Sequence, residues 1–289
     1  NDGMANELWI NEGNWRFRNE ALFAGVAVNA DGREEAGMGV DAADCDGDGR
    51  EDIVLSHLSN EHNTLYMQIG DGAYRDETRQ RGEMAMASWA YTGFGIAFVD
   101  YDRDGWLDLA SVNGLVTFPD DREGQGPFPL QQPNQLMRNS GGCQWLNVSA
   151  SEPALQVAET SRGLAVGDLN NDGAPDLLIS NAAGPARLLL NQAAPDRHWL
   201  GLRLLERNGA DALGARARVQ PPEGPSQWRR VRRDGSYASA RDPRLLFGLG
   251  DWSGPVEIEV HWADGAVERW SALAADRYHV VQRGAGRVE

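Results

Sequence analysis

Three copies of a nine-residue acidic pattern constrain this 289-residue chain more than any other feature. They are DCDGDGRED (44–52), DYDRDGWLD (100–108) and DLNNDGAPD (168–176), and their starts are 56 and 68 residues apart. Each copy has an oxygen-bearing side chain at positions 1, 3, 5 and 9 and a glycine at position 6. A repeat of this length predicts an array of similar supersecondary units that pack against one another.

The segments around each copy have the character of short β-strands. Small and apolar residues precede the loops in GMGVDAA, GFGIAFV and RGLAVG, and apolar runs follow them in IVLSHLS, LASVNGL and LLISNAA. Turn residues separate these runs from further strand-like segments, and the N-terminal NELWINEGNWRF resembles such a segment from a unit whose loop is absent. Because repeated four-stranded units are typical of propeller blades, we expect an all-β fold with about three to four blades.

The acidic loops have the chemistry of calcium sites. In a tight loop the side chains at positions 1, 3 and 5 can converge, position 7 offers its backbone carbonyl, and position 9 closes the cage. Hard oxygen ligands in a flexible cage favour Ca²⁺ over Mg²⁺ or Zn²⁺, so we expect about three structural calcium ions. The predicted ligands are Asp44, Asp46, Asp48, Arg50, Asp52, Asp100, Asp102, Asp104, Trp106, Asp108, Asp168, Asn170, Asp172, Ala174 and Asp176.

The acidic loops admit other interpretations. An EF-hand needs a glutamate at position 12 and flanking helices, whereas position 12 here is Leu55, Ser111 or Ile179 and the flanks are strands. Metal-free Asp/Gly turns and a catalytic carboxylate pair stay open as less favoured alternatives. Because Asn170 replaces a carboxylate, the third loop should bind calcium most weakly.

Charge is distributed unevenly along the chain. Residues 1–196 contain 31 acidic residues and 12 arginines, whereas residues 197–289 contain 12 acidic residues and 15 arginines. The net charge of −16 argues against a nucleic-acid partner, because phosphate repels an acidic surface. The chain has no lysine, which excludes Schiff-base chemistry and a P-loop. No apolar run approaches the ~18 residues of a membrane-spanning helix.

The two cysteines, Cys45 and Cys143, fit no metal-binding spacing. One disulfide between them is possible, but two unpaired small residues are the favoured interpretation. The histidines show no metal-binding spacing either.

The loops with their flanks, as in GLAVGDLNNDGAPDLLISNAAGPARLLLNQ, resemble FG-GAP/VCBS repeats of integrin-α-type β-propellers. The tail resembles an ASPIC/UnbV domain in HWLGLRLLERNGADALGARARV, RDGSYASARDPRLLFGLGD and VEIEVHWADGAVERW. The combination is similar to the bacterial relatives of cartilage acidic protein. This resemblance implies propeller blades over 1–196, an ASPIC/UnbV-like domain over 197–289, calcium binding, and secretion. Such propellers usually have about seven blades, so either the chain is the C-terminal part of a longer protein, which we favour, or partner chains complete it.

The C-terminal unit is expected to be a small antiparallel β-domain. VEIEVHW alternates between apolar and polar residues, and ADG then turns into AVERW, which predicts a hairpin. Strand alternation divides the arginines of WRRVRRDG between two faces. A solvated strand or a contact with the acidic propeller is therefore favoured over an anion site.

The sequence predicts a non-catalytic, calcium-binding interaction or assembly module outside the cytoplasm, either periplasmic, at the cell surface or secreted. A protein partner or the missing half of the propeller is expected, and a carbohydrate is possible. The Pro- and Gly-rich segment 117–133, with Trp106 nearby, is a candidate partner contact or a plain spacer. The alternative is a hydrolase or lyase with its site at the central channel, which the small apolar starts of the first strands disfavour.

Overall fold

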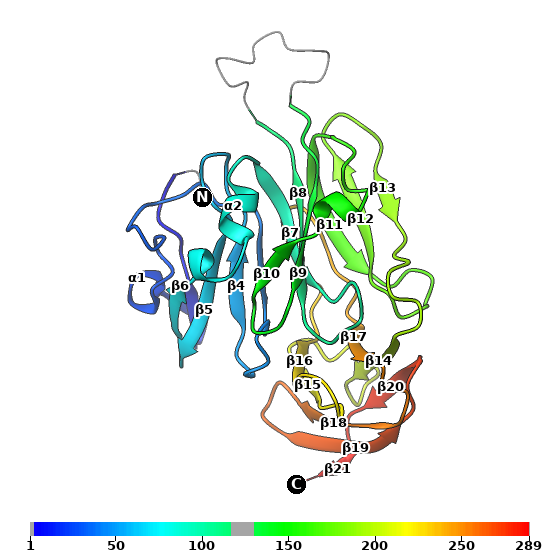
Figure 1. Ribbon diagram of the computed structural model, residues 1–289. Helices are drawn as coiled ribbons and strands as arrows, with labels where there is room; N and C mark the ends of the chain where they lie inside the picture. The colour runs from blue at the N-terminus through cyan, green and yellow to red at the C-terminus, as the bar shows by residue number, and fades with distance from the viewer. Residues whose placement is uncertain (1–2, 117–129, 289) are drawn as a thin grey trace.

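The computed structural model describes residues 3–116 and 130–288, which form a fan of small sheets and a C-terminal β-domain packed against one end of it (Figure 1). A two-stranded sheet opens the fan, two four-stranded sheets follow, and a three-stranded sheet ends it. Their strands are β1 (Trp9–Gly13), β2 (Arg16–Asn19), β3 (Val40–Ala43), β4 (Asp52–Leu55), β5 (Thr64–Gly70), β6 (Ala73–Asp76), β7 (Gly93–Val99), β8 (Asp108–Asn113), β9 (Gln135–Asn139), β10 (Trp145–Asn147), β11 (Ser161–Gly167), β12 (Asp176–Asn181) and β13 (Arg187–Leu189).

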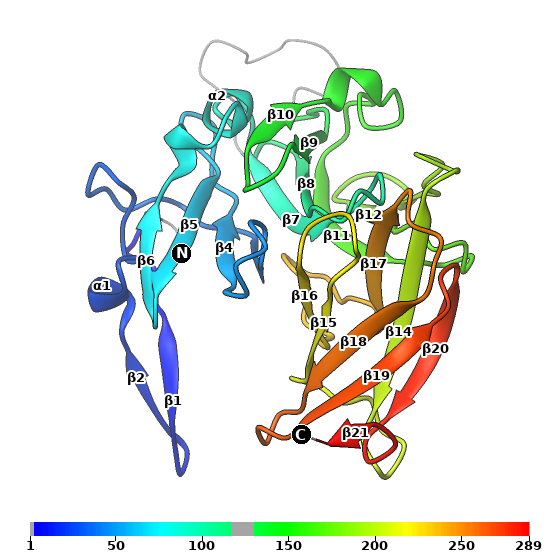
Figure 2. The same cartoon turned by 60° about the horizontal axis from the view of Figure 1, so that its bottom comes forward.

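Within each sheet of the fan, strands adjacent in sequence pair antiparallel. The first strands β3, β7 and β11 lie side by side, so each sheet presents its first strand to the centre of the fan and its later strands to the outside (Figure 2). This is a β-propeller arrangement, and the predicted all-β propeller class is confirmed.

Glycines in or directly before the first strands allow this close approach. A Cβ atom on Gly39 would lie 2.0 Å from the Phe94 carbonyl oxygen, and one on Gly95 would lie 2.6 Å from the Cβ of Leu164. Real Cβ atoms do not approach other heavy atoms so closely, so larger residues would push the sheets apart. The Gly-rich sequences before each acidic loop therefore specify the contact between neighbouring blades.

Two apolar cores lie between neighbouring blades. The first includes Val54, Phe98 and Trp145, and the second includes Val112, Leu136 and Ile179. Burial of apolar side chains is the main source of stability for these thin sheets, at ~25 cal/mol per Å² removed from water. Each blade therefore depends on its neighbours.

Helical structure among the described residues is limited to single turns. These are α1 (Ala21–Ala24), α2 (Met84–Ser88) and the 3-10 helices at Thr78–Gln80 and Ser149–Ser151. Across the described part of the chain, no helix has the length and apolarity needed to cross a membrane.

The C-terminal domain is a sandwich of two sheets around one apolar core, which includes Leu202, Phe247 and Val260. One sheet has the order β17–β14–β20 and the other the order β16–β15–β18–β19–β21. The strands are β14 (His198–Leu205), β15 (Arg216–Val219), β16 (Gln227–Arg230), β17 (Leu245–Gly250), β18 (Val256–His261), β19 (Val267–Leu273), β20 (Arg277–Gln282) and β21 (Arg287–Val288).

One feature of this domain differs from the prediction. The hairpin of β18 and β19 is confirmed, but β14 and β20 pair in parallel, so the domain is not purely antiparallel. After β19 the chain passes from the second sheet to the first, and it reaches the edge of β14 running in the same direction (Figure 2). Parallel pairs need such a crossover between sheets, which local patterning does not reveal.

Candidate metal centres

Each acidic loop connects the first and second strands of one blade. The first loop (44–52) follows β3, the second loop (100–108) follows β7, and the third loop (168–176) follows β11. Because these strands are neighbours with the same position in their blades, the three loops gather at one end of the fan, against the C-terminal domain (Figure 1).

The loops share one internal hydrogen-bond pattern. The position-1 carboxylate accepts the N–H of position 6 at 2.9–3.1 Å, and the position-5 carboxylate accepts the N–H of position 7 at 2.8–2.9 Å. The position-3 side chain accepts the N–H of position 5 at 3.1–3.3 Å. The side chains at positions 1, 3 and 5 thus turn inward onto their own loop, as the repeat predicts.

The backbone adopts left-handed conformations at two positions of every loop. Position 6 is Gly49, Gly105 or Gly173, with φ of 81–92°. Position 4 is also left-handed, although it is occupied by Arg103 (φ 56°) in the second loop and Asn171 (φ 60°) in the third. A left-handed arginine is uncommon, so the loop geometry is imposed by the surrounding contacts as well as by glycine.

The position-9 aspartates connect strands. One carboxylate oxygen of each accepts the N–H of position 2 at 2.8–3.2 Å. The other oxygen accepts the N–H of a residue further along the blade, Gln68, Asn139 or Asn191, at 2.8–2.9 Å. Position 9 therefore closes the loop and fastens it to its own blade, a second role that ligand spacing alone did not indicate.

The first loop brings three predicted ligands together. One carboxylate oxygen from each of Asp44, Asp46 and Asp48 lies within 4.8 Å of the others. Burial raises the pKa of Asp44 to about 6 and that of Asp52 to about 7, because charged carboxylates lose their hydration there. Arg50 forms an ion pair with Asp48 at the exposed side of this loop.

The second loop is the most buried. Oxygen atoms of Asp100, Asp102 and Asp108 lie within 4.8 Å of one another. Asp100 is only 7% exposed, and its Oδ1 atom has no hydrogen-bond partner. Burial raises the pKa of Asp100 to about 7 and that of Asp108 well above its ordinary value. A buried carboxylate oxygen without a donor is costly, and a bound cation would satisfy it.

Two arginines approach the outer side of the second loop. Arg138 lies 3.2 Å from Asp102 and 3.6 Å from the predicted ligand Asp104, and Arg197 lies 3.2 Å from Asp102. These contacts leave Asp100 and Asp108, which lie deeper, without a basic side chain within ion-pair distance among the described residues.

The third loop already satisfies several of its own oxygens. The Nδ2 group of Asn170 donates to Asp172 at 2.7 Å, and the Tyr278 hydroxyl donates to Asp168 at 2.8 Å. Within the described residues, no group of three carboxylates in this loop converges as in the other two. The prediction that this is the weakest site rested on Asn170, and the Tyr278 contact adds a second reason.

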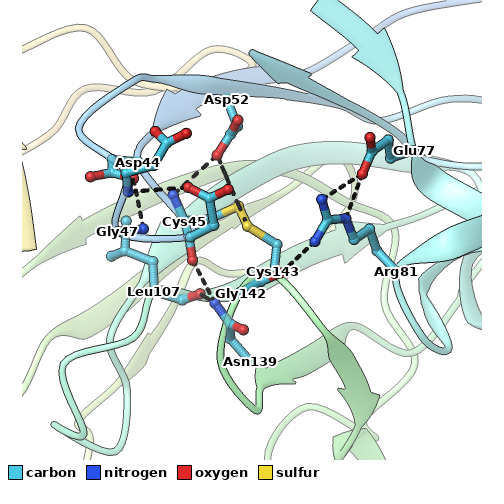
Figure 3. Close-up of a disulfide and its surroundings, with 12 residues drawn as sticks. Asp44, Cys45, Gly47, Asp52, Glu77, Arg81, Leu107, Asn139, Gly142 and Cys143 are labelled. Carbon is cyan, nitrogen blue, oxygen red and sulfur yellow. Dashed lines mark hydrogen bonds and ion pairs between the residues drawn. A yellow bond between two sulfur atoms is a disulfide. The ribbon is translucent and has the colours of Figure 1, made fainter. Parts of the chain in front are cut away.

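A disulfide joins the first loop to the neighbouring blade. Cys45, at position 2, is bonded to Cys143, in the turn before β10, which corrects the preference for unpaired cysteines (Figure 3). The sequence did not indicate this pairing, because the two cysteines are 98 residues apart and come together only when two blades pack against each other. Since the sulfur atoms are bonded to each other, they are not available as thiolate ligands beside Asp52.

Contacts around the disulfide reinforce this junction. The Asn139 side-chain amide donates to the carbonyls of Cys45 and Leu107 at 2.9 and 3.0 Å, so one residue contacts the first and second loops together (Figure 3). Arg81 donates to the Gly142 carbonyl at 2.7 Å and forms an ion pair with Glu77. The loops are therefore held by a covalent and hydrogen-bonded framework.

The C-terminal domain contacts all three loops. Arg216 donates to the Gly49 carbonyl at 2.6 Å, and the Gly248 N–H donates to Asp100 at 3.1 Å. Arg244 donates to the Asp168 carbonyl at 2.7 Å. A Cβ on Gly248 would lie 2.3 Å from Asp100, so only glycine allows β17 to approach the second loop. The arginine run WRRVRRDG also contacts the acidic propeller, through Arg230 with Glu51 and Arg232 with Asp41, which confirms this one of the two interpretations favoured for it.

The centre of this contact is a buried ion-pair cluster. Asp41 of β3 is 3% exposed and pairs with Arg232 at 2.5 Å and Arg241 at 2.7 Å. Although burial alone would raise the pKa of Asp41, the charges of Arg241 and Arg232 and the Phe98 N–H hold it below its ordinary value.

Replacing this aspartate should loosen the contact between the two parts. We expect Asp41→Asn to lower the free energy of unfolding by about 3 kcal/mol or more, because two buried guanidinium groups lose their counter-ion. Since the pKa is depressed in the folded state, the stabilisation is present above the ordinary value of 3.8 and is lost as pH falls below it. Urea unfolding at pH 7 and at pH 3 measures both effects.

The matched control is Asp234→Asn, which removes an exposed carboxylate 3.7 Å from the same Arg232. It should change stability by less than about 1 kcal/mol. Equal effects of the two substitutions would show that the buried pair is not important for the contact.

Residues 117–129 of the candidate partner segment 117–133 lie outside the described residues. The ring of Trp106, the aromatic residue named with this segment, lies beside the first loop, since a Cβ on Gly47 would be 3.6 Å from it. The backbone N–H of Trp106 donates to Asp104 in its own loop.

The fold, the repeated loops and the family comparisons agree. A family model described as FG-GAP-like repeat matches residues 44–111, and one described as ASPIC and UnbV matches residues 205–288. The chain therefore combines a β-propeller arrangement that includes an FG-GAP-like repeat over residues 44–111 with an ASPIC and UnbV domain over residues 205–288, as the sequence resemblance implied.

Its relatives include cartilage acidic protein 1. The chain is 25% identical to the protein of Mus musculus and 26% identical to that of Homo sapiens, over 98% of its own length in both alignments. It spans 42% and 40% of those relatives, which is about two fifths of their length.

A solved lectin structure from Agrocybe aegerita, which concerns recognition of non-reducing terminal N-acetylglucosamine, is 16% identical and covers 64% of this chain and 60% of its own. Its TM-score of 0.27 is too low to support an argument about fold or ligand.

Proposed function

We propose that this chain is a calcium-binding, non-catalytic interaction or assembly module that works outside the cytoplasm. The observation that carries the calcium proposal is the second loop, where three carboxylates converge within 4.8 Å and the buried Asp100 Oδ1 has no partner. Oxygen ligands that are close together, flexible and anionic match the preferences of Ca²⁺.

The proposed ligands follow the repeat. Asp44, Asp46 and Asp48 would hold calcium in the first loop, and Asp100, Asp102 and Asp108 in the second. Bound calcium would neutralise carboxylates that burial otherwise drives towards protonation. The third loop would bind a third calcium ion, with a lower affinity than the first two loops.

The role as an interaction module is supported by the N-terminal hairpin. Strands β1 and β2 pair only with each other among the described residues, and both faces of this hairpin are exposed. Trp9 is 55% exposed, Trp15 95% and Phe17 54%. Aromatic side chains exposed in this way are typical of contact surfaces, which fits a protein partner or further propeller blades.

Two further observations support the non-catalytic and extracytoplasmic parts of the proposal. The acidic groups Asp41, Glu51 and Asp242, which lie around the centre of the fan, are occupied in ion pairs with arginines. The disulfide and the relationship to cartilage acidic protein 1 are both consistent with an oxidising compartment.

The direct test is calcium binding by equilibrium dialysis with radioactive calcium, on the full chain after chelation and exchange. Wild type should bind two to three ions, and Asp100→Asn should lose one of them. The exposed turn variant Asp71→Asn is the matched control and should bind as wild type does. A wild-type chain that binds no calcium at millimolar concentration would refute the proposal.

A further inference from the structure

A pocket of about 100 Å³ lies between the first strands of the blades and the C-terminal domain. Ala42, Val99 and Gly167 contribute its lining from β3, β7 and β11, so it is at the centre of the fan. The rest of the lining is unusually basic. Its cationic residues are Arg103, Arg229, Arg230, Arg232, Arg241 and Arg244.

Most of these arginines have a carboxylate partner. Arg230 pairs with Glu51 at 2.9 Å, and Arg244 pairs with Asp242 at 2.6 Å. Arg232 and Arg241 share one carboxylate, that of Asp41. Asp41 is the buried carboxylate that these two arginines share, and the second carboxylate near Arg232, that of Asp234 at 3.7 Å, is exposed to solvent.

Two of the six lack such a partner among the described residues. Arg103 donates to the Ala193 and Ala194 carbonyls, and the other exception is Arg229, which carboxylates of the first and second loops attract from a distance. Within the described residues it has no carboxylate at ion-pair distance, and its guanidinium donates to the Trp228 carbonyl at 3.1 Å and to the Gln227 amide oxygen at 3.3 Å. A longer contact of 3.5 Å reaches the Gly105 carbonyl. Neutral acceptors satisfy some of its N–H groups but do not balance its charge.

The charge on Arg229 is balanced only at a distance. The largest attractive electrostatic interactions on it come from Asp100 and Asp44, and Arg241 repels it. Asp100 and Asp44 are also the position-1 ligands of the proposed calcium sites. Once each of them faces a calcium ion, its negative charge is no longer available to Arg229. This step rests on the proposed function.

We propose that the interdomain pocket binds one small oxyanion of the sulfate or phosphate type, held by Arg229 with Arg232 and Arg241, and that calcium in the first two loops strengthens this binding. A guanidinium group presents paired N–H donors that match two oxygens of such an anion. The volume has room for only a few water molecules, which fits a free oxyanion and excludes a larger ligand. By linkage, the anion strengthens calcium binding by the same factor.

The test is equilibrium dialysis of the full chain against radioactive sulfate, because phosphate would precipitate with calcium. In 1 mM calcium we expect one saturable sulfate per chain, with an affinity at least about fivefold higher than in chelator. Arg229→Gln should weaken sulfate binding at least about tenfold, and Arg229→Lys should weaken it less because it keeps the charge. Calcium content is measured on the same samples.

The matched control is Arg233→Gln, which removes an exposed arginine of the same segment that pairs with Asp211. It should bind sulfate as wild type does. Saturable sulfate binding that is lost in Arg229→Gln and retained in this control supports the site. If Arg229→Gln does not fold, the sulfate affinities of the wild type and of Arg229→Lys are compared instead, and equal affinities would refute the role of Arg229.

Two outcomes would overturn the proposal in distinguishable ways. A calcium-loaded chain without saturable sulfate binding would refute the oxyanion site and leave the calcium sites intact. Sulfate binding that is equal in calcium and in chelator would refute the linkage. If the chain in 1 mM calcium also contains no bound calcium, the proposed calcium-binding function is refuted together with the linkage.

Discussion

Removing calcium with a chelator is expected to lower the melting temperature of this chain by about 10–20 °C. Each site saturated at 100 times its Kd adds about 2.7 kcal/mol to the stability of the folded state. The two well-formed loops would together contribute about 5 kcal/mol, and a domain of this size shifts by about 2–4 °C per kcal/mol. Differential scanning calorimetry in 1 mM calcium and in chelator measures the shift.

The pH dependence of this shift provides an internal control. In the calcium-free chain the pKa of Asp44 is raised to about 6 and those of Asp52 and Asp100 to about 7. Because the folded state holds these protons more tightly than the unfolded state, calcium-free stability falls as pH rises from about 4 towards 7. The effect of the chelator should therefore be larger at pH 8 than at pH 5.5. Identical melting curves with and without calcium at both pH values would contradict the structural role of the ions.

Opening the disulfide is expected to have the next largest effect. The Cys45–Cys143 bond closes a loop of about 100 residues, for which chain entropy alone gives about 4.7 kcal/mol. The double variant Cys45→Ala, Cys143→Ala should lose about 2–5 kcal/mol, measured by urea unfolding in calcium. It should also bind calcium more weakly in the first loop, because Cys45 is position 2 of that loop.

Reduction of the wild-type chain separates the bond from the packing of the side chains. Both cysteines are buried, at 1% and 0% exposure, so truncation to alanine also removes apolar contacts. If the reduced wild type loses as much stability as the double variant, the covalent link accounts for the effect. Unchanged unfolding of the reduced chain would show that the blades dock equally well without it.

The fold and the loops were predictable because their signals are local. The inward-facing oxygens at positions 1, 3 and 5 follow from residues separated by one neighbour, and the glycine at position 6 marks a left-handed turn. The alternation in Val256–His261 likewise predicts its own hairpin. Each of these features depends on a few consecutive residues.

The features that the sequence did not predict all require distant segments to meet. Cys45 meets Cys143 only when two blades have docked, and Asp41 meets Arg241 across 200 residues of sequence. Arg103 has a left-handed backbone, and its guanidinium donates to the Ala193 carbonyl, 90 residues further along the chain. Pattern analysis of one chain gives residue types for such contacts but not their partners.

The C-terminal domain touches the first loop through Arg216, the second through Gly248 and the third through Arg244. Calcium binding to one loop would order the C-terminal domain, which also contacts the other two loops. Binding of the first calcium ion would then include part of the entropy cost of ordering this domain, and binding of the later ions would not include that part again. Calcium binding to this chain would consequently be cooperative, with a Hill coefficient above one, and would become a set of independent sites if the domain were detached.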